Sequence, residues 1–260
     1  MNDFSDLGRI LVIIPTYNER DNVTRIVSRV RSAVPEAHVL VADDNSPDGT
    51  ARVADELAAT DDHVQVMHRL GKEGLGAAYL AGFSWALDNG YDVVVEMDAD
   101  GSHQPEQLPL LLDALRNADL VLGSRWVPGG SVVNWPKSRE ILSKGGNWYT
   151  RRALRIPLQD ATGGYRAFRA STLRALDLDG VGSAGYIFQV DLAYRTLAKG
   201  MRVVEVPIEF VEREVGDSKM NRKIVSEALW RVTVWGFRDR TRRLSRWRNS
   251  RRRHSTGEGW

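Results

Sequence analysis

Two carboxylates separated by one residue are the side chains of this sequence best suited to hold a metal ion. Asp98 and Asp100 lie in the segment Glu-Met-Asp-Ala-Asp-Gly-Ser-His at 96–103, directly after an apolar run. In an extended segment residues two apart project to the same side, so the pair can bind one hard divalent cation. A magnesium ion held this way usually completes its shell with substrate phosphates. The alternative is two solvated acids in a turn that caps the next helix, but the pair follows a strand that is apolar on both faces.

Polar residues also follow the first two apolar runs of the chain. The segments are Pro-Thr-Tyr-Asn-Glu at 15–19 and Asp-Asp-Asn-Ser-Pro-Asp-Gly-Thr at 43–50. A carboxylate at a strand end can accept hydrogen bonds from a ribose or a base edge, and Tyr17 can stack on a base. Two adjacent acids are costly unless they are solvated or used, which favours ligand contact for Asp44. The Asp-Gly-Thr at 48–50 is interpreted as a turn and helix cap.

Isolated cations at strand ends suit a diphosphate. Arg125 follows the fifth apolar run, and Arg213 and Lys219 lie in a glycine-containing loop. The alternative for each of them is a surface salt bridge. The glycine-rich segment 70–76 opens a helical pattern and could offer amides to a phosphate, but it matches no phosphate-loop motif.

Strands and helices alternate along the first half of the sequence. Runs that are apolar throughout predict strands covered on both faces, so we expect a mainly parallel, Rossmann-like sheet with helices on both sides. Ligands bind at the carboxyl ends of such strands, so the loops after Ile14, Ala42, Met97 and Gly123 should line one cleft. The expected strands are 9–15, 38–42, 63–68, 92–97 and 120–123, and the expected helices are 21–33, 48–59, 73–89 and 104–117.

The second half is less regular. We expect one catalytic domain at 1–220, an amphipathic membrane-surface helix at 221–247 and a disordered basic tail at 248–260. The expected elements are a Gly/Pro-rich loop at 126–136, a helix at 139–154, a strand at 163–168, a helix at 188–199, a strand at 201–206 and a helix at 224–235.

Composition excludes several classes of function. The 260 residues contain no cysteine, which rules out a disulfide framework, a thiolate zinc site and a cysteine nucleophile. Neither a signal peptide nor a run of ~20 apolar residues is found, so we expect a soluble or peripheral protein in the cytoplasm. Residues 238–260 carry +7 and the remainder −5. Such a tail suits anionic lipid or nucleic acid, but no recognised nucleic-acid motif is present.

Together these segments resemble the dolichol- and polyprenol-phosphate mannose synthases, which are family-2 glycosyltransferases with the A-type fold. The resemblance runs in order from Ile10 to about Trp235, nearly the whole domain. It rests on Pro-Thr-Tyr-Asn-Glu at 15–19, Asp-Asp-Asn-Ser-Pro-Asp-Gly-Thr at 43–50, Met-Asp-Ala-Asp at 97–100, Gly-Ser-Arg at 123–125, Arg139 with Ser143, and Val-Glu-Arg-Glu-Val-Gly-Asp-Ser-Lys at 211–219.

The resemblance implies transfer of mannose from GDP-mannose to a polyprenyl phosphate with inversion, in the presence of Mg2+ or Mn2+. It places the enzyme on the cytoplasmic face of a membrane, where a separate membrane-anchoring protein would be a further partner. It assigns Pro15, Tyr17, Glu19, Ala42 and Asp44 to guanosine, Asp98, Ala99 and Asp100 to metal and diphosphate, Arg125, Arg213 and Lys219 to phosphate and sugar, and Arg139 and Ser143 to the lipid phosphate.

The sequence departs from the family pattern at Ser102, where an archaeal member has a glutamine as a further metal ligand. This leaves Ser102, His103 or water as the third ligand. A phosphate monoester has a second pKa near ~6, so the acceptor is already an anion and needs no general base. A synthase of the same fold that uses UDP-glucose on the same lipid is the nearest alternative, although many such relatives carry two C-terminal membrane spans. A nucleic-acid-binding module is a more distant one.

Overall fold

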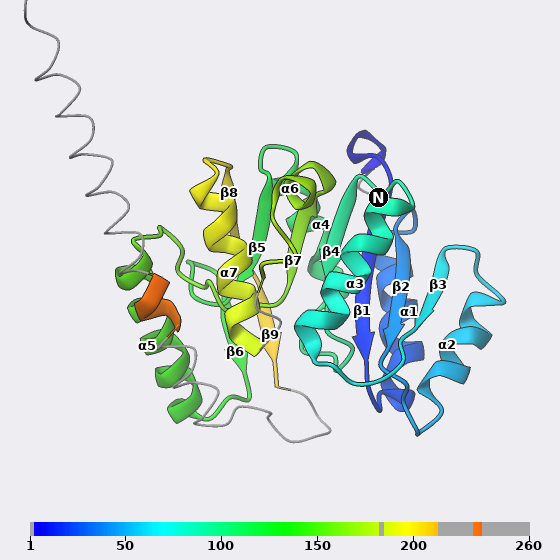
Figure 1. The fold of residues 1–260 in the computed structure, drawn as a ribbon. Helices are drawn as coiled ribbons and strands as arrows, with labels where there is room; N and C mark the ends of the chain where they lie inside the picture. The colour runs from blue at the N-terminus through cyan, green and yellow to red at the C-terminus, as the bar shows by residue number, and fades with distance from the viewer. Residues whose placement is uncertain (1–2, 182–184, 213–230, 236–260) are drawn as a thin grey trace, which may run out of the picture.

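The fold is a seven-stranded, mostly parallel sheet with helices on both faces (Figure 1). The computed structural model describes residues 3–181, 185–212 and 231–235. The strand order is β3-β2-β1-β4-β7-β5-β8. The strands are β1 (Ile10–Thr16), β2 (His38–Asp43), β3 (Val64–His68), β4 (Val93–Glu96), β5 (Leu120–Ser124), β7 (Arg166–Arg169) and β8 (Val203–Pro207). The expected class of fold is confirmed.

Two hydrophobic clusters, one on each face, hold the sheet. Alternate side chains of β1 supply both: Val12 and Ile14 pack on one side, and Leu11 and Ile13 on the other. The first cluster takes the apolar faces of α1 (Arg20–Ala33), α2 (Thr50–Ala58) and α4 (Leu108–Leu115). The second takes those of α3 (Leu75–Asp88), α6 (Ala170–Ala175) and α7 (Gly185–Ala198). Because the sheet is buried on both faces, its strands appear in the sequence as continuous apolar runs.

Strand β7 runs antiparallel to both of its neighbours, β4 and β5. It begins at Arg166, three residues later than the expected start at 163. The two preceding glycines lie outside the ladder because the backbone makes close approaches there. A Cβ on Gly163 would lie 2.8 Å from the carbonyl oxygen of Gly123. The short strand thus enters the sheet from a tight loop at the carboxyl ends of the parallel strands.

A second, two-stranded sheet was not expected. Strand β6 (Ser131–Val133) pairs in parallel with β9 (Glu209–Val211). The prediction of a loop throughout 126–136 was therefore wrong. Three residues are too few for a periodic pattern to appear in the sequence, and the partner strand lies far along the chain.

The other corrections concern the ends of elements. The helix expected at 104–117 is a 3-10 turn, Pro105–Gln107, followed by the shorter α4, and α6 was not expected. Helix α7 begins before residue 188, and β8 begins after residue 201. Helix α5 (Lys137–Leu154) starts two residues earlier than expected. None of the helices among the described residues is both long and apolar enough to cross a membrane.

Residues 231–235 lie beside α5 in the structure (Figure 1). The hydroxyls of Tyr149 and Thr233 are hydrogen-bonded at 2.6 Å. Val232 is buried in the second cluster, so that side chain packs inside the protein. The rest of the expected surface helix at 221–247 and the basic tail at 248–260 lie outside the described residues.

Two helical glycines give opposite predictions for stability. A Cβ on Gly82 of α3 would lie 2.8 Å from Cδ1 of Ile13, whereas a Cβ on Gly145 of α5 would meet nothing within 4 Å. Gly82→Ala should lower the free energy of unfolding by about 1–3 kcal/mol through overpacking. Gly145→Ala should raise it by about 0.5–1 kcal/mol because alanine favours the helix. Urea denaturation measures both, and equal shifts would contradict the proposed packing of α3 on β1.

Candidate active site

A tight turn after β4 presents the two predicted metal ligands. Gly101 has a φ of 77°, a left-handed conformation that favours glycine and reverses the chain after Asp100. Oδ1 of Asp100 accepts hydrogen bonds from the backbone N–H of Ser102 at 3.1 Å and from its hydroxyl at 2.5 Å. The side chain of Asp98 is 30% exposed. The turn therefore orients Asp100 and leaves part of Asp98 accessible to a ligand.

The buried side chain of His103 packs against this turn and supports it. The backbone N–H of Asp98 donates to Nδ1 of His103 at 3.0 Å, so the proton of the neutral ring lies on Nε2. Burial lowers the pKa of His103, whose side chain is 1% exposed. The ring stacks on Tyr165 with centroids 5.1 Å apart. The hydroxyl of Tyr79 donates to Oδ1 of Asp98 at 3.2 Å. Because Nδ1 of His103 accepts the hydrogen bond from the backbone of Asp98, this nitrogen cannot serve as a metal ligand.

The donor set fits a hard divalent cation. Asp98 and Asp100 offer carboxylate oxygens, which Mg2+ and Mn2+ prefer over softer ligands. Among the residues that the structure describes, no group of three or more His, Cys, Asp or Glu side chains could hold a metal. The protein thus offers two carboxylates with the Ser102 hydroxyl beside them, and phosphate oxygens or water would complete the shell.

The adjacent acids after β2 have different surroundings. Asp43 accepts hydrogen bonds from the hydroxyls of Thr16, at 2.9 Å, and Ser46, at 2.6 Å, which fix the turn. Asp44 is buried and pairs with Arg69. Burial raises the pKa of Asp44, and the charge of Arg69 opposes that rise. Of the two acids, Asp43 therefore stabilises the loop itself.

The other predicted nucleotide-binding residues lie at the ends of β1 and β2. Lys72 lies over the ring of Tyr17, with Nζ 3.8 Å from its centroid. Glu19 accepts a hydrogen bond from Asn22 at 2.8 Å. Pro15 and Ala42 are paired across the two strands. The parallel register brings these residues to one edge of the sheet, as expected.

Arg125 forms a buried ion pair that was not predicted. Its Nε and Nη2 donate to the two carboxylate oxygens of Asp160 at 2.6 and 2.7 Å, and its backbone N–H donates to Oδ2 at 3.1 Å. The side chains are 7% and 0% exposed. Burial alone would raise the pKa of Asp160, but the charge and hydrogen bonds of Arg125 hold it below its ordinary value. The pair is therefore ionised, with a fixed geometry.

Thr162 in the loop of Asp160 and residues from two further segments, α5 and β8, hold this pair in place. Nη2 of Arg125 donates to Thr162 at 3.0 Å, and Nδ2 of Asn147 on α5 donates to Asp160 at 3.2 Å. Glu205 of β8 accepts the backbone N–H of Asp160 at 2.7 Å. None of these partner residues was predicted from the sequence. The available signal was the run Gln-Asp-Ala-Thr-Gly-Gly at 159–164, in which polar residues adjoin a glycine pair.

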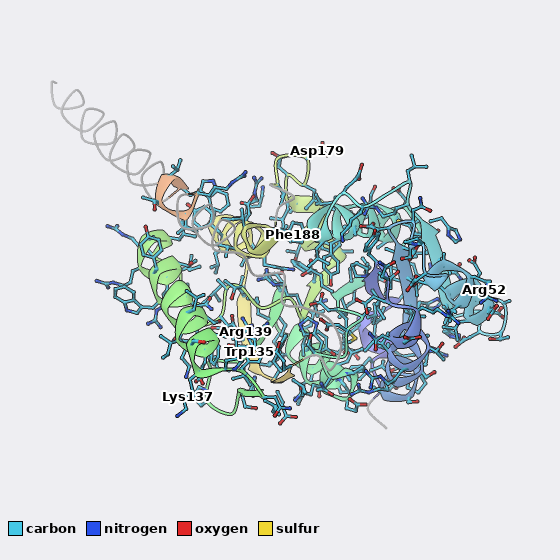
Figure 2. All side chains as sticks on the ribbon, turned by 90° about the horizontal axis from the view of Figure 1, so that it is seen from below. Arg52, Trp135, Lys137, Arg139, Asp179 and Phe188 are labelled. Carbon is cyan, nitrogen blue, oxygen red and sulfur yellow. The ribbon has the colours of Figure 1, made fainter. Side chains whose placement is uncertain are left out.

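The predicted acceptor residue Arg139 lies at the start of α5 and is also paired. It forms an ion pair with Glu212, which follows β9, and its guanidinium lies 4.0 Å from the ring centroid of Trp135 (Figure 2). No hydrogen bond to Nε of Arg139 is found among the described residues. Ser143 follows one turn later on α5, and its backbone carbonyl accepts from Asn147 at 3.1 Å.

Phe210 of β9 connects the two sides of the site. Its ring makes edge contacts with the rings of His103 and Trp135, with centroids 5.5 Å and 5.4 Å apart. The guanidinium of Arg125 lies 5.4 Å from the centroid of the same ring. The structure therefore brings Asp98, Arg125 and Arg139 into one region through short contacts. Arg213 and Lys219 lie outside the described residues.

A second buried pair of ionisable side chains lies beneath the site, where Glu96 of β4 faces Arg166 of β7. Burial raises the pKa of Glu96 to about 8 and lowers that of Arg166 to about 10. Arg166 donates to the carbonyls of Ala161 and Gly163 at 2.8 Å. These bonds fix the backbone of the loop that carries Asp160.

The fold is shared with glycosyltransferases of known structure. Glucosyl-3-phosphoglycerate synthase from Mycobacterium tuberculosis aligns with a TM-score of 0.64 at 17% identity, over 89% of this chain and 84% of that one. The mannosyltransferase PcManGT from Pyrobaculum calidifontis, solved with GDP-Man and Mn2+, aligns with a TM-score of 0.59 at 19% identity, over 90% and 64%. The chain therefore has the A-type glycosyltransferase fold.

The chain belongs to glycosyl transferase family 2, whose model matches residues 11–177. It is 58% identical to the undecaprenyl-phosphate mannosyltransferase of Micrococcus luteus over 94% of this chain and 98% of that one. It is also 58% identical to the polyprenol monophosphomannose synthase of Mycolicibacterium smegmatis, over 89% and 88%. The dolichol-phosphate mannosyltransferase of Pyrococcus furiosus is 37% identical over 87% of this chain and 64% of its own length.

The buried ion pair gives a test of how the site is held together. Asp160→Ala should lower the free energy of unfolding by about 3–5 kcal/mol, because it leaves Arg125 buried without a counter-charge. Glu56→Ala is the matched control, since the Arg52–Glu56 pair on α2 is exposed and such pairs contribute less than about 1 kcal/mol. Urea denaturation of both variants measures the two losses in the free energy of unfolding. Similar small losses would show that Arg125 is not held by Asp160.

Proposed function

We propose that this chain transfers mannose from GDP-mannose to a polyprenyl phosphate with inversion, and so makes polyprenyl β-mannosyl phosphate. The observation that carries the proposal is 58% identity over nearly the full length to transferases named for this lipid acceptor and this sugar. Asp44 after β2, Asp98 and Asp100 after β4, and Arg125 after β5 all follow the carboxyl ends of parallel strands of an A-type sheet, which supports the same conclusion.

On this proposal the guanosine of the donor contacts Pro15, Tyr17, Glu19, Ala42 and Asp44. Support comes from their shared position at the carboxyl ends of β1 and β2, next to the turn that carries Asp98. Tyr17 offers an aromatic face and Asp44 a carboxylate, which suit a base and its polar edge. For Asp44 to bind a ribose or a base, part of its pairing with Arg69 has to be shared or exchanged.

Asp98 and Asp100, with Ala99 between them, would hold Mg2+ or Mn2+ against the diphosphate of the donor. The bound ion supplies positive charge that stabilises the departing nucleoside diphosphate. The two carboxylates and the oriented turn fit such an ion, as described above. Arg125, Arg213 and Lys219 would add cationic groups around the phosphates and the sugar. Asp160 would hold the guanidinium of Arg125 in place beside the donor.

Arg139 and Ser143 would receive the acceptor phosphate. A guanidinium can grip a phosphate through two hydrogen bonds, and the stacking of Arg139 on Trp135 pre-orients that planar group. The phosphate monoester is already an anion at neutral pH, so it can attack the anomeric carbon without losing a proton to the protein. The nucleoside diphosphate then leaves from the opposite face of the sugar, which inverts the configuration.

A lipid acceptor implies that the enzyme works at a membrane surface, on the side where nucleotide sugars occur. We propose peripheral association with the cytoplasmic face of the membrane, supported by a body without a spanning helix among its described residues and by nine arginines in residues 238–260. Basic residues near anionic lipid contribute about 1 kcal/mol each. A separate membrane-anchoring protein would be a further partner.

The reaction is tested by incubating purified protein with Mg2+, polyprenyl phosphate and labelled GDP-mannose, and measuring the label extracted into organic solvent. We expect product with GDP-mannose and none with UDP-glucose. Asp98→Ala and Asp100→Ala should each lower kcat/KM by about a hundredfold or more, because they remove the ligands of the charge-stabilising ion. A chelator should abolish transfer, and Mg2+ or Mn2+ should restore it.

The control for these variants is Asp88→Ala, which removes an exposed carboxylate at the end of α3. Its turnover should match that of the unmodified chain. Transfer from UDP-glucose alone would assign a different donor. Near-normal turnover of Asp98→Ala or Asp100→Ala would refute the metal site.

The acceptor assignment gives a separate prediction. Arg139→Ala should raise the KM for polyprenyl phosphate and lower kcat/KM by about ten- to a hundredfold, through loss of a charge-assisted contact. The affinity for GDP-mannose, measured by calorimetry, should stay nearly unchanged. Lys137→Ala removes an exposed cation from the same end of α5 and should change neither quantity. Loss of donor binding in Arg139→Ala with an unchanged KM for the lipid would reverse the two subsites.

A further inference from the structure

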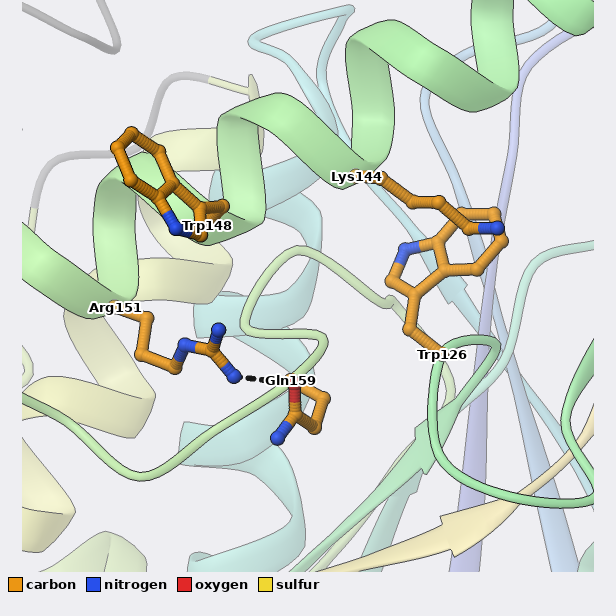
Figure 3. Close-up of a pocket in the computed structure, with 5 residues that line it drawn as sticks. All are labelled: Trp126, Lys144, Trp148, Arg151 and Gln159. Atoms are coloured by element: carbon orange, nitrogen blue, oxygen red, sulfur yellow. Dashed lines mark hydrogen bonds between the residues drawn. The ribbon is translucent and has the colours of Figure 1, made fainter.

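A pocket on the flank of α5 has a lining that none of the roles above uses. Its volume is about 190 Å3, and it is lined by Trp126, Lys144, Trp148, Arg151 and Gln159 (Figure 3). Lys144, Trp148 and Arg151 come from α5, whereas Trp126 follows Arg125 at the end of β5. Gln159 lies in the segment that leads to Asp160.

The pocket is rich in hydrogen-bond donors. Figure 3 shows the indole nitrogen of Trp126 directed into it, and among the described residues Nε1 of Trp126 is buried without a hydrogen-bond partner. The guanidinium of Arg151 enters from the opposite side and donates to Gln159 through Nη1. Nζ of Lys144 lies 4.9 Å from the ring centroid of Trp126. An indole N–H, a guanidinium and an ammonium therefore surround one space.

Among the residues that the structure describes, no carboxylate lines this space. Lys144 does have an acidic partner, Glu140, one turn earlier on α5 at 2.5 Å, but Glu140 is not part of the lining. Arg151 is paired with a neutral amide. The described lining thus carries two positive charges, of which only that of Lys144 has a carboxylate partner, together with a buried N–H donor that has no partner. Trp148, which is 59% exposed, adds an apolar wall at the mouth.

The pocket is distinct from the subsite assigned to the acceptor phosphate. Arg139, Ser143 and Asn147 follow one another at intervals of four residues, so they share one face of α5. That face is fixed by the bond from Asn147 to Asp160 and by the ion pair of Arg139. Lys144, Trp148 and Arg151 form a second row at the same kind of interval, on the neighbouring flank.

We propose that this pocket binds a second phosphoryl group, with Arg151, Lys144 and Nε1 of Trp126 as its donors. Phosphate oxygens suit the planar guanidinium, the point charge of an ammonium and a single neutral N–H. The exposed ring of Trp148 allows the group to carry an ester carbon. Two sources share this chemistry, namely free phosphate and the headgroup of an anionic phospholipid.

The test measures binding to the full chain, so it does not depend on transfer of a sugar. One arm titrates inorganic phosphate by calorimetry at fixed ionic strength. The other measures cosedimentation with vesicles of phosphatidylglycerol and phosphatidylcholine, and with phosphatidylcholine alone. The variants are Arg151→Gln, which removes the charge, and Trp126→Phe, which keeps the ring and removes the N–H. Arg152→Gln is the matched control, because Arg152 is exposed on the same turn of α5 and does not line the pocket.

We expect Arg151→Gln to weaken binding about tenfold and Trp126→Phe about threefold, as for loss of a charged and a neutral hydrogen bond. Arg152→Gln should have no effect. An effect in the phosphate arm assigns the pocket to a free anion, and an effect confined to anionic vesicles assigns it to a lipid headgroup. Equal losses in Arg151→Gln and Arg152→Gln, with binding by Trp126→Phe unchanged, would mean general charge attraction and would overturn the proposal, as would unchanged binding in both arms. Thermal melts of each variant exclude unfolding as the cause.

Discussion

The buried pairing of Arg125 with Asp160 is the interaction on which the rest of the site depends. Asp160 receives three hydrogen bonds from Arg125 and one from Asn147 of α5, and its own backbone N–H is bound by Glu205 of β8. A buried charge without its partner is strongly destabilising, so β5, α5 and β8 have to meet at this point. This contact, together with the packing of Tyr149 and Leu154 in the second cluster, sets the position of α5 relative to the sheet, and with it that of Ser143.

A series of aromatic contacts connects the turn of Asp98 with the start of α5. His103 lies beneath the turn of Asp98, Phe210 touches His103 and Trp135, and Trp135 supports Arg139. Rings in edge and stacked contact are rigid and lose little entropy when they are buried. This chain of contacts explains how the turn that carries Asp98 and Asp100 and the start of helix α5 can be held at a constant separation.

Such rigidity has a functional reason. Attack by a phosphate on an anomeric carbon requires that two charged substrates approach in line, and most of the barrier that a protein can lower comes from placement and fixed charges. The second buried pair, Glu96 with Arg166, serves the same end, because Arg166 fixes the carbonyls of the loop that leads to Asp160. The polar groups below the site are thus organised before any ligand binds.

Local pattern in the sequence was enough to predict the parallel strands, most helices, and the carboxylates and cations at the strand ends. These features arise from burial on both faces of the sheet and from residues close together in the chain. The partners of those cations were not predictable in this way. Asp160 lies 35 residues from Arg125, and Glu212 lies 73 residues from Arg139. The pairing of β6 with β9 joins segments that are still farther apart in the chain. Only the tertiary structure decides such contacts, because which charges are buried together depends on how the chain is folded, and no local periodicity records it.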